Sequence, residues 1–515
     1  MSLRKNKLFL GAGLLVSVVS LTANSVLAGN ADDTLTWATE REVDVVLPYY
    51  SNVRETAIMV RHVWDNLLYR DTKTSEYKPL LATSYKWVDN VTLEFELRKD
   101  VAFHNGSTFE ADDVVATFNH VINPDNGVLT KRNVSWMKRA VKLGPYKVRV
   151  HLKRPFPAAL EYLSGPNAIL PAEIWATAKK DGKGKIDYGT IAPIGTGPYK
   201  ITQVVPGESV RMEINKNYMD RSPKGKPSIG KLVFRTVHDA ETRMAGLLTG
   251  SLDWIWGISK DKVNDLKAMG GVTIVNAPTM RINYIVMDRA DRAKGSPLAR
   301  KKVRLAVAHA IDREAIAREL VGGSSQVIHS ACFPSQFGCT QDVPKYEYNP
   351  KLAKKMLTEA GYPDGFEIDI YAYREREVTE AVIGYLKQIG IRANLKFNQP
   401  KALRGRVWEG NAPFHQSTWG SFSVNDVSAI TSHFFTHGRD DYCRDDDVKK
   451  WLDVGDTSTD PKIRKDAYKR ALHRIQEQLC WLPMFTYTKN YGYSKDLDFI
   501  PTADEFPRFF SAKWK

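Results

Sequence analysis

Side chains able to bind a metal or to carry out catalysis are sparse in this sequence and stand far apart. His433 and His437 are four residues apart and could share one face of a helix, where two imidazoles could bind a metal ion. A polar surface helix is the better interpretation of this pair, because the other histidines lack ligand spacing. The acids at 445–447 fit the negative first turn of a helix better than a calcium loop. We therefore expect no metal site and no other cofactor.

The sequence motifs of the common enzyme classes are missing from the chain. There is no HExxH, no GxxxxGK[ST] and no GxSxG motif, and no GxGxxG follows a strand pattern. Such motifs would supply a zinc site, a phosphate-binding loop, a serine nucleophile or a dinucleotide site. The sequence shows no reaction chemistry and predicts a binding protein, not an enzyme.

The cysteines of the chain are Cys332, Cys339, Cys443 and Cys480. In an oxidising compartment they would form two disulfides. The first two bracket a short loop that proline and glycine can turn back on itself. Helices predicted over 445–452 and 460–479 are joined by a short turn, and this hairpin would return the last cysteine to the third. The sequence favours the pairs 332–339 and 443–480 over the other two connectivities.

The length and charge of the chain limit the kinds of protein that it can be. Its 515 residues are too many for one core and predict about three lobes. Lysines and arginines number 74 against 59 aspartates and glutamates, but they are spread without a polybasic tract. A solvated surface explains this charge better than a nucleic acid partner. With 43% hydrophobic and 26% charged residues, the composition excludes a disordered chain and a multi-span membrane protein.

The only long apolar run stands at the start of the chain. Arg4, Lys5 and Lys7 precede the apolar stretch 8–21, and Val26-Leu27-Ala28 offers a cleavage site. This arrangement predicts a secretory signal peptide. Because the first cysteine comes much later, no lipid can be attached at the cleavage site, and we expect release into a bacterial periplasm.

Hydrophobic periodicity predicts a mixed α/β protein. Apolar and polar residues alternate, as in half-buried strands, over 93–97, 146–152, 210–214 and 366–370. Amphipathic helices with typical end residues are predicted over 349–361, 378–390 and 460–479. Since no low-complexity linker separates the lobes, we expect the chain to cross between them at ordinary strands.

Seven segments carry a more specific pattern, at 81–87, 92–106, 109–115, 195–199, 215–218, 303–313 and 359–366. They include Gly195-Thr196-Gly197-Pro198-Tyr199, whose glycines suit a tight turn, and Phe103-His104-Asn105-Gly106, typical of a strand end with an Asn-Gly turn. The ordered set resembles the family 5 bacterial extracellular solute-binding proteins, the oligopeptide, dipeptide and nickel receptors of ABC importers. The resemblance extends over about residues 34–499.

The resemblance implies a three-lobed α/β periplasmic binding protein of type II, of the peptide-receptor class, with a discontinuous domain I. The expected boundaries are a signal peptide at 1–28, domain I at 29–76, 197–285 and 489–515, domain II at 77–196 and domain III at 286–488. Such a receptor closes because a ligand that contacts both lobes binds the closed state selectively. The implied partner is the membrane permease of an ABC importer. We expect a monomer that binds no nucleic acid.

The resemblance also implies a ligand site. Relatives that bind dipeptides use an arginine for the ligand carboxylate, and this arginine matches Arg374, although a surface ion pair with a nearby glutamate would also explain it. The tryptophan that precedes the ammonium-binding aspartate of relatives matches Trp419, which core packing would explain equally well. Three residues later stands Phe422 instead of the aspartate, and the nearest acid is Asp426, a more structural position. Ser421 completes the expected site.

The missing aspartate predicts a solute whose corresponding end is apolar, blocked or differently charged, unless another loop supplies an acid. Glu40 and Asp44 are the candidates for that acid. The expected solute is a peptide or a peptide-like compound, for example an opine or a modified amino-acid conjugate. The alternatives are a non-peptide solute such as a metal chelate or haem, or use of the protein as a sensor or chaperone.

Overall fold

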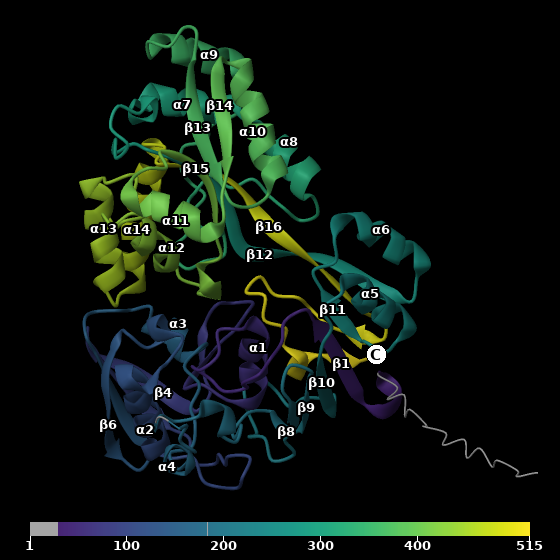
Figure 1. Cartoon of the computed structure of the whole chain (residues 1–515). Helices are drawn as coiled ribbons and strands as arrows, with labels where there is room; N and C mark the ends of the chain where they lie inside the picture. The colour runs from purple at the N-terminus through teal and green to yellow at the C-terminus, as the bar shows by residue number, and fades with distance from the viewer. Residues whose placement is uncertain (1–28, 183) are drawn as a thin grey trace, which may run out of the picture.

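The computed structural model describes residues 29–182 and 184–515, and its largest element is a ten-stranded mixed sheet. The predicted signal peptide, 1–28, lies outside the described residues. In spatial order the strands are β14 (Ile391–Phe397), β13 (Phe366–Ala372), β15 (Phe414–Trp419), β12 (Val272–Met287), β16 (Trp481–Ser494), β11 (Trp254–Trp256), β1 (Thr34–Thr39), β10 (Lys231–Thr236), β9 (Ser209–Ile214) and β8 (Tyr199–Val205). Figure 1 shows that this sheet passes through both halves of the molecule.

The chain between β12 and β16, residues 288–480, forms the upper lobe of Figure 1. Its helices are α7 (Lys301–Ala310), α8 (Arg313–Ile316), α9 (Pro350–Glu359), α10 (Arg376–Gln388), α11 (Pro400–Glu409), α12 (Ser428–Phe434), α13 (Asp446–Thr457) and α14 (Pro461–Glu477). Helices α7, α9 and α10 share one hydrophobic core with β13, whereas α13 and α14 belong to a second one. The upper lobe is therefore built around two cores on the shared sheet.

The other described residues form the lower lobe. An antiparallel sheet stands apart from the large one and contains β4 (Ala82–Asp89), β5 (Thr92–Leu97), β7 (Lys147–Leu152) and β6 (Met137–Gly144). Two short pairs are β2 (Leu68–Arg70) with β3 (Tyr77–Pro79), and β17 (Leu497–Asp498) with β18 (Lys513–Trp514). The helices are α1 (Arg54–Val63), α2 (Ala111–Ile122), α3 (Ala159–Leu163), α4 (Ile174–Thr177), α5 (Ala240–Thr249) and α6 (Lys260–Met269). One core joins the four-stranded sheet to β1, β9 and β10, and a smaller core packs α5 and α6 against β1 and β11.

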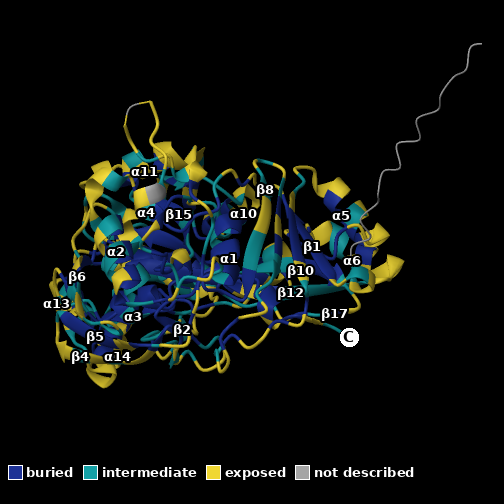
Figure 2. Ribbon diagram, turned by 90° about the horizontal axis from the view of Figure 1, so that it is seen from below, coloured by how far each residue is buried: buried dark blue, intermediate teal, exposed yellow. Residues whose placement is uncertain are grey.

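The elements predicted from periodicity are confirmed. The four alternating segments form β5, β7, β9 and β13, and the three amphipathic segments form α9, α10 and α14. Helix α9 begins as its sequence predicts, because the Asn349 side chain accepts a hydrogen bond from the Leu352 N–H and Pro350 takes the first turn. Figure 2 shows buried residues along the sheets and exposed residues on the outer faces of the helices.

Two long strands, β12 and β16, carry the chain between the lobes. They pair in antiparallel register from Val272 with Ser494 to Val286 with Trp481. The register shifts between Pro278 and Ile282 and again just after Asn283, so the pair is irregular near its middle. Such irregularities bend a strand and increase its twist. As expected from the sequence, the lobes are interwoven at strands, with no linker.

Gly195 and Gly197 lie where the backbone at the end of α1 passes too close to leave room for a side chain. A β-carbon on Gly195 would lie 2.0 Å from the Val63 carbonyl oxygen, and one on Gly197 would lie 2.5 Å from that of His62. His104 belongs to the same turn, since its Nε2 lies 3.0 Å from the Gly197 carbonyl oxygen. The segment therefore packs against the end of α1, and His104 is a structural histidine.

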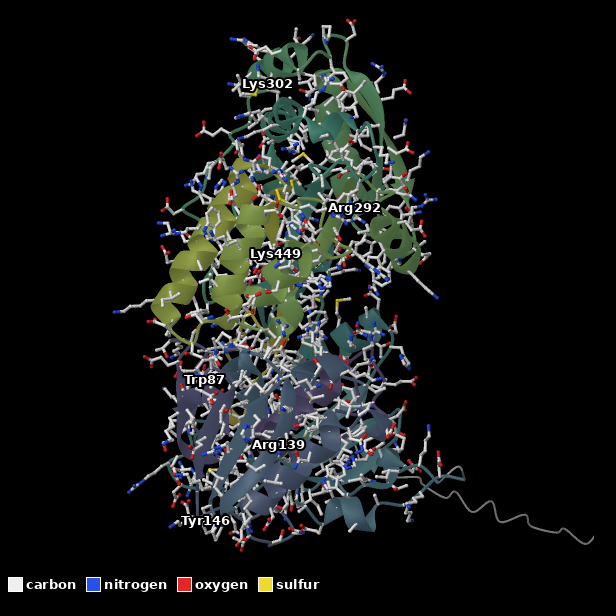
Figure 3. The ribbon with its side chains drawn as sticks, turned by 90° about the vertical axis from the view of Figure 1, so that its left-hand side faces the viewer. Trp87, Arg139, Tyr146, Arg292, Lys302 and Lys449 are labelled. Carbon is white, nitrogen blue, oxygen red and sulfur yellow. A yellow bond between two sulfur atoms is a disulfide. The ribbon has the colours of Figure 1, made fainter. Side chains whose placement is uncertain are left out.

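Both disulfides form with the pairing favoured by the sequence. Cys332 is bonded to Cys339 and Cys443 to Cys480, with Cα atoms 5.8 and 5.0 Å apart. The second bond closes the α13–α14 hairpin onto the start of β16. Charged side chains project from both lobes in Figure 3, as a solvated surface requires. None of the helices in the described part of the chain is long and apolar enough to span a membrane.

Candidate functional site

A cavity of about 540 Å³ lies where the two lobes meet. Its wall comes mainly from 47–61, 129–133, 161–166 and 506–510 of the lower lobe and from 422–424 of the upper lobe. The volume falls in the range typical of small-molecule sites. Because both lobes contribute to the wall, separating them would open the cavity to solvent.

The upper lobe reaches the cavity through a left-handed turn after β15. Ser421, Phe422 and Ser423 have φ angles of 47°, 51° and 61° in succession. Residues other than glycine avoid this conformation, at a cost of roughly 1–2 kcal/mol each. The turn leaves the Phe422 ring 52% exposed at the cavity wall, while Ser421 is buried. Strained turns of this kind persist where they position a functional group.

Phe422 contacts an arginine of the lower lobe. The guanidinium carbon of Arg132 lies 3.0 Å from the centroid of the Phe422 ring, a cation–π contact. Trp419 meets Phe422 edge-on at 4.8 Å and donates its indole N–H to the Ala429 carbonyl at 2.9 Å. His433 stacks on the same tryptophan, with ring centroids 4.8 Å apart. Trp419 thus supports Phe422 from behind.

The contact with Arg132 changes what a carboxylate at position 422 is expected to do. In the Phe422→Asp variant, the new carboxylate lies beside the Arg132 guanidinium and pairs with it in preference to a ligand ammonium group. We expect no gain in calorimetric affinity for free-amine peptides over their N-acetyl forms. In Phe422→Asp combined with Arg132→Ala, the carboxylate is free and such a gain should appear. A gain of about tenfold, or 1.4 kcal/mol, in the single variant would contradict this interpretation.

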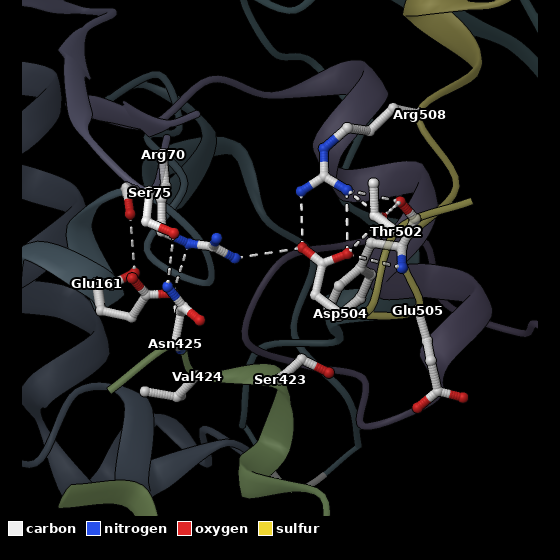
Figure 4. A network of polar contacts seen from close by, with 12 residues as sticks. Arg70, Ser75, Glu161, Ser423, Val424, Asn425, Thr502, Asp504, Glu505 and Arg508 are labelled. Carbon is white, nitrogen blue, oxygen red and sulfur yellow. Dashed lines mark hydrogen bonds and ion pairs between the residues drawn. The ribbon is translucent and has the colours of Figure 1, made fainter. Parts of the chain in front are cut away.

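A network of buried ion pairs joins the lobes beside the cavity (Figure 4). Arg70 Nε donates to Glu161 Oε1 at 2.9 Å, and Arg70 Nη2 lies 3.4 Å from Asp504 Oδ2. Arg508 donates to both oxygens of Asp504, at 2.7 and 3.0 Å. The backbone N–H of Asn425, in the upper lobe, donates to Glu161 Oε1 at 3.1 Å. Glu161 therefore connects the network to the upper lobe.

A second buried pair lies behind α1. The Lys224 ammonium group is 2.6 Å from Asp65 Oδ1 and donates to the carbonyl oxygens of Arg61 and Trp64 at 2.8 and 3.1 Å. Burial lowers the pKa of Lys224, and the charge and hydrogen bond of Asp65 oppose that shift. Since all its N–H groups are occupied within the wall, Lys224 has a structural role.

The arginine expected to bind a carboxylate lies elsewhere. Arg374 forms an ion pair with Glu375, and its guanidinium lies 5.3 Å from the Tyr487 ring centroid. Glu375 in turn accepts a hydrogen bond from the Tyr487 hydroxyl at 2.6 Å. Arg374 does not line the cavity, and the alternative interpretation, an ion pair with a nearby glutamate, describes its surroundings.

The expected acids also have internal partners or lie away from the cavity. Both oxygens of Asp426 accept from Arg464 Nη2, at 3.0 and 2.8 Å, and both residues are buried. Glu40 is exposed and lies 3.8 Å from Arg243. Asp44 is exposed as well and does not line the cavity. Of the site residues expected from the sequence, Phe422 alone contributes to the described wall.

The histidine pair does not share a helix, and that prediction is wrong. Helix α12 ends at Phe434, whereas His437 lies beyond it with a φ of 65°. His433 and His437 face different acids, each at 3.5 Å. Within residues 29–182 and 184–515, no group of three or more His, Cys, Asp or Glu side chains could hold a metal ion.

Comparison with known proteins agrees with this architecture. The model of the bacterial extracellular solute-binding proteins, family 5, matches residues 76–442. The chain belongs to this family. The glutathione-binding protein GsiB of Salmonella choleraesuis is 25% identical over 466 residues, which cover 87% of this chain and 88% of the relative. The family consists of solute-binding receptors that act outside the cytoplasm.

Solved structures of family 5 proteins share the fold. The structure of HbpA2 from Haemophilus parasuis matches with a TM-score of 0.82 at 23% identity, over 94% of this chain and 100% of that one. NikA from Brucella suis in complex with Fe(III)-EDTA matches with a TM-score of 0.77 at 22% identity, again over 94% and 100%. The type II fold of α/β periplasmic binding proteins expected from the sequence is thus present.

Sequence reasoning missed the charged residues Arg61, Arg132 and Glu161, which line the cavity, and Asp504, which belongs to the ion-pair network beside it. None of them stands in the segments that resemble the family pattern. The spacing of Asp504 and Arg508, four residues apart, is the one signal in the sequence, but such pairs are common on solvated helices. These residues come together only through the fold.

Proposed function

We propose that this family 5 protein is the solute receptor of an ABC importer, and that it holds a peptide or peptide-like solute between its lobes. The cavity at the lobe interface carries the proposal, because its wall is complete only when both lobes contribute. A relative that is similar over most of its length is a glutathione-binding protein, which supports a small peptide-like solute here. The receptor then presents its closed form to the membrane permease.

The proposed domains follow the boundaries given above: domain I at 29–76, 197–285 and 489–515, domain II at 77–196 and domain III at 286–488. Domain III under this division is close to the upper lobe. A ligand that contacts Phe422 on one side and α1 on the other would stabilise the closed state, since only that state offers both contacts. We further propose that the receptor acts as a monomer in the periplasm, where its disulfides are stable.

Solute binding should raise the melting temperature and make the particle more compact. Native mass spectrometry of the protein purified from its own periplasm would identify a retained solute. That solute, or a hit from pools of di- to pentapeptides, should raise the melting temperature in proportion to the logarithm of its concentration. Small-angle scattering should show a smaller radius of gyration in its presence. If the lobes stay apart and no small solute binds, the receptor proposal is wrong.

A further inference from the structure

The cavity wall carries more positive charge than its acidic side chains balance. Its basic residues are Arg54, Arg61, Arg70, Lys131, Arg132, Lys224 and Arg508. Four of them have acidic partners: Arg54 with Glu505, Arg70 with Glu161 and Asp504, Lys224 with Asp65, and Arg508 with Asp504. The other three, Arg61, Lys131 and Arg132, form no ion pair with any residue in the described part of the chain. Arg61 interacts with the charges of Asp504 and Glu161, but both acids are already paired with Arg70 or Arg508. The wall therefore keeps an excess of positive charge.

Arg61 is the most enclosed of these three. It lies on α1, and its guanidinium carbon is 3.7 Å from the centroid of the Phe506 ring. On its other side is the loop 161–166, where a β-carbon on Gly165 would lie 3.8 Å from Arg61 Nη2. This spacing is an ordinary van der Waals contact, so the loop packs against the guanidinium. Its side-chain nitrogens have no hydrogen-bond acceptor among the described residues, although they border the cavity.

Stacking on Phe506 accounts for only part of this geometry. A cation–π contact uses one face of the guanidinium, but the group also carries five N–H donors that need acceptors. Burial lowers the pKa of Arg61 to about 10, so the group still carries its charge at neutral pH. Keeping this charged guanidinium in a partly desolvated wall costs free energy unless an anion or water in the cavity accepts its hydrogen bonds.

We propose that the solute is acidic, with a net negative charge, and that Arg61 binds one of its carboxylates. The inference rests on the proposed receptor function and specifies its ligand. The guanidinium offers a carboxylate two parallel N–H donors. Arg132 and Lys131, at the rim where Phe422 approaches, provide positive potential for a second anionic group. An acidic peptide-like solute balances the charge of the wall, whereas a neutral or basic one does not.

The probes are pools of tripeptides that carry glutamate at the first, second or third position, each matched by a pool with glutamine there. Glutamate and glutamine have nearly the same shape, so the comparison isolates the charge. In the wild type, the best glutamate pool should bind at least about tenfold more tightly than its glutamine counterpart by isothermal calorimetry. The difference should shrink as salt is added.

The variant Arg61→Gln tests the residue. It should weaken binding of the best glutamate peptide by about thirtyfold or more, the usual effect of removing one partner of a buried hydrogen-bonded charge pair. Binding of the matched glutamine peptide should change little. Arg235→Gln is the control, since Arg235 is exposed on β10 away from the cavity. Melting temperatures of the unliganded variants show whether each is folded.

The outcomes separate the two proposals. If Arg61→Gln weakens both peptides equally, or if the wild type binds both equally, the inference is wrong while the receptor function stands. If Arg374→Gln, and not Arg61→Gln, removes the preference for glutamate, the carboxylate is bound in the upper lobe and the inference is again wrong. If no peptide pool binds the folded wild type, the receptor proposal fails and this inference fails with it.

Discussion

Replacing Asp504 by alanine should lower the free energy of unfolding by roughly 3–5 kcal/mol, because it leaves buried arginines without their counter-charge. Asp504 is 2% exposed and accepts from Arg508 through both carboxylate oxygens, with Arg70 on its other side. The Thr502 hydroxyl also donates to it, at 2.7 Å. Urea denaturation followed by tryptophan fluorescence would measure the loss.

The matched control is Asp498→Ala. Asp498 is partly exposed and lies 3.6 Å from Lys513, an ion pair in solvent that should contribute no more than about 1 kcal/mol. If both variants lose the same stability, the buried network does not hold the lobes as described. The comparison is direct, since both acids lie in the C-terminal segment.

The contribution of Asp504 to the free energy of unfolding should decrease at acidic pH. Burial alone would raise the pKa of Asp504, but the charges of Arg508, Arg61 and Arg70 and the hydrogen bond from Arg508 outweigh it and hold the pKa well below its usual range. Because the pKa is lower in the folded state, Asp504 stabilises the fold at pH values above its pKa in the unfolded chain, about 3.9. This stabilisation is lost as the pH falls below that value. The difference between wild type and Asp504→Asn should therefore be constant above pH 5 and shrink towards pH 2. A difference that grows on acidification would contradict the assignment.

Loss of the disulfide between Cys443 and Cys480 should lower the free energy of unfolding about as much as the Asp504→Ala variant. The bond spans 37 residues, and the chain-entropy model assigns it about 4 kcal/mol. The bond between Cys332 and Cys339 spans 7 residues and should contribute about 2.5 kcal/mol. Double alanine variants at each pair, unfolded in urea without reductant, give the two values.

Alanine suits this comparison because all four cysteines are buried or half-buried, where a serine hydroxyl would lack partners. The order of the two losses is the decisive result. An equal or larger loss for the short loop would show that local packing around Cys332, and not loop closure, dominates.

Much of the fold follows from local sequence. Alternation at 93–97 and 366–370 marks strands whatever surrounds them, and Asn349 with Pro350 fixes the start of α9 by local hydrogen bonding. The cysteine pairing follows because the α13–α14 hairpin is a short-range structure. The family segments add the order of the elements.

The residues of the candidate site could be predicted from the sequence far less well than the fold. Arg374 matches the carboxylate-binding position of relatives, and Asp426 is the acid nearest to their ammonium-binding position. The fold places Glu375 and Arg464 beside these two residues, and they pair with them. Arg61 has no distinguishing neighbour in the sequence. Its place at the cavity depends on Phe506, more than 400 residues later, and on the loop around Gly165. Contacts of such sequence separation leave no local pattern to detect.

The ribbon formed by β12 and β16 has a mechanical consequence. Residues 288–480 lie between these two strands, so both covalent connections of the upper lobe run through the ribbon. Strand β15 pairs with β12 only from Ile282 onwards, and β11 pairs with β16 only from Tyr491 onwards. Between these points, at the irregular stretch after Pro278, the sheet is only two strands wide. A narrow ribbon of this kind bends readily across its face, whereas its inter-strand hydrogen bonds resist sliding and stretching. We therefore expect rotation of one lobe against the other to concentrate at this two-stranded stretch.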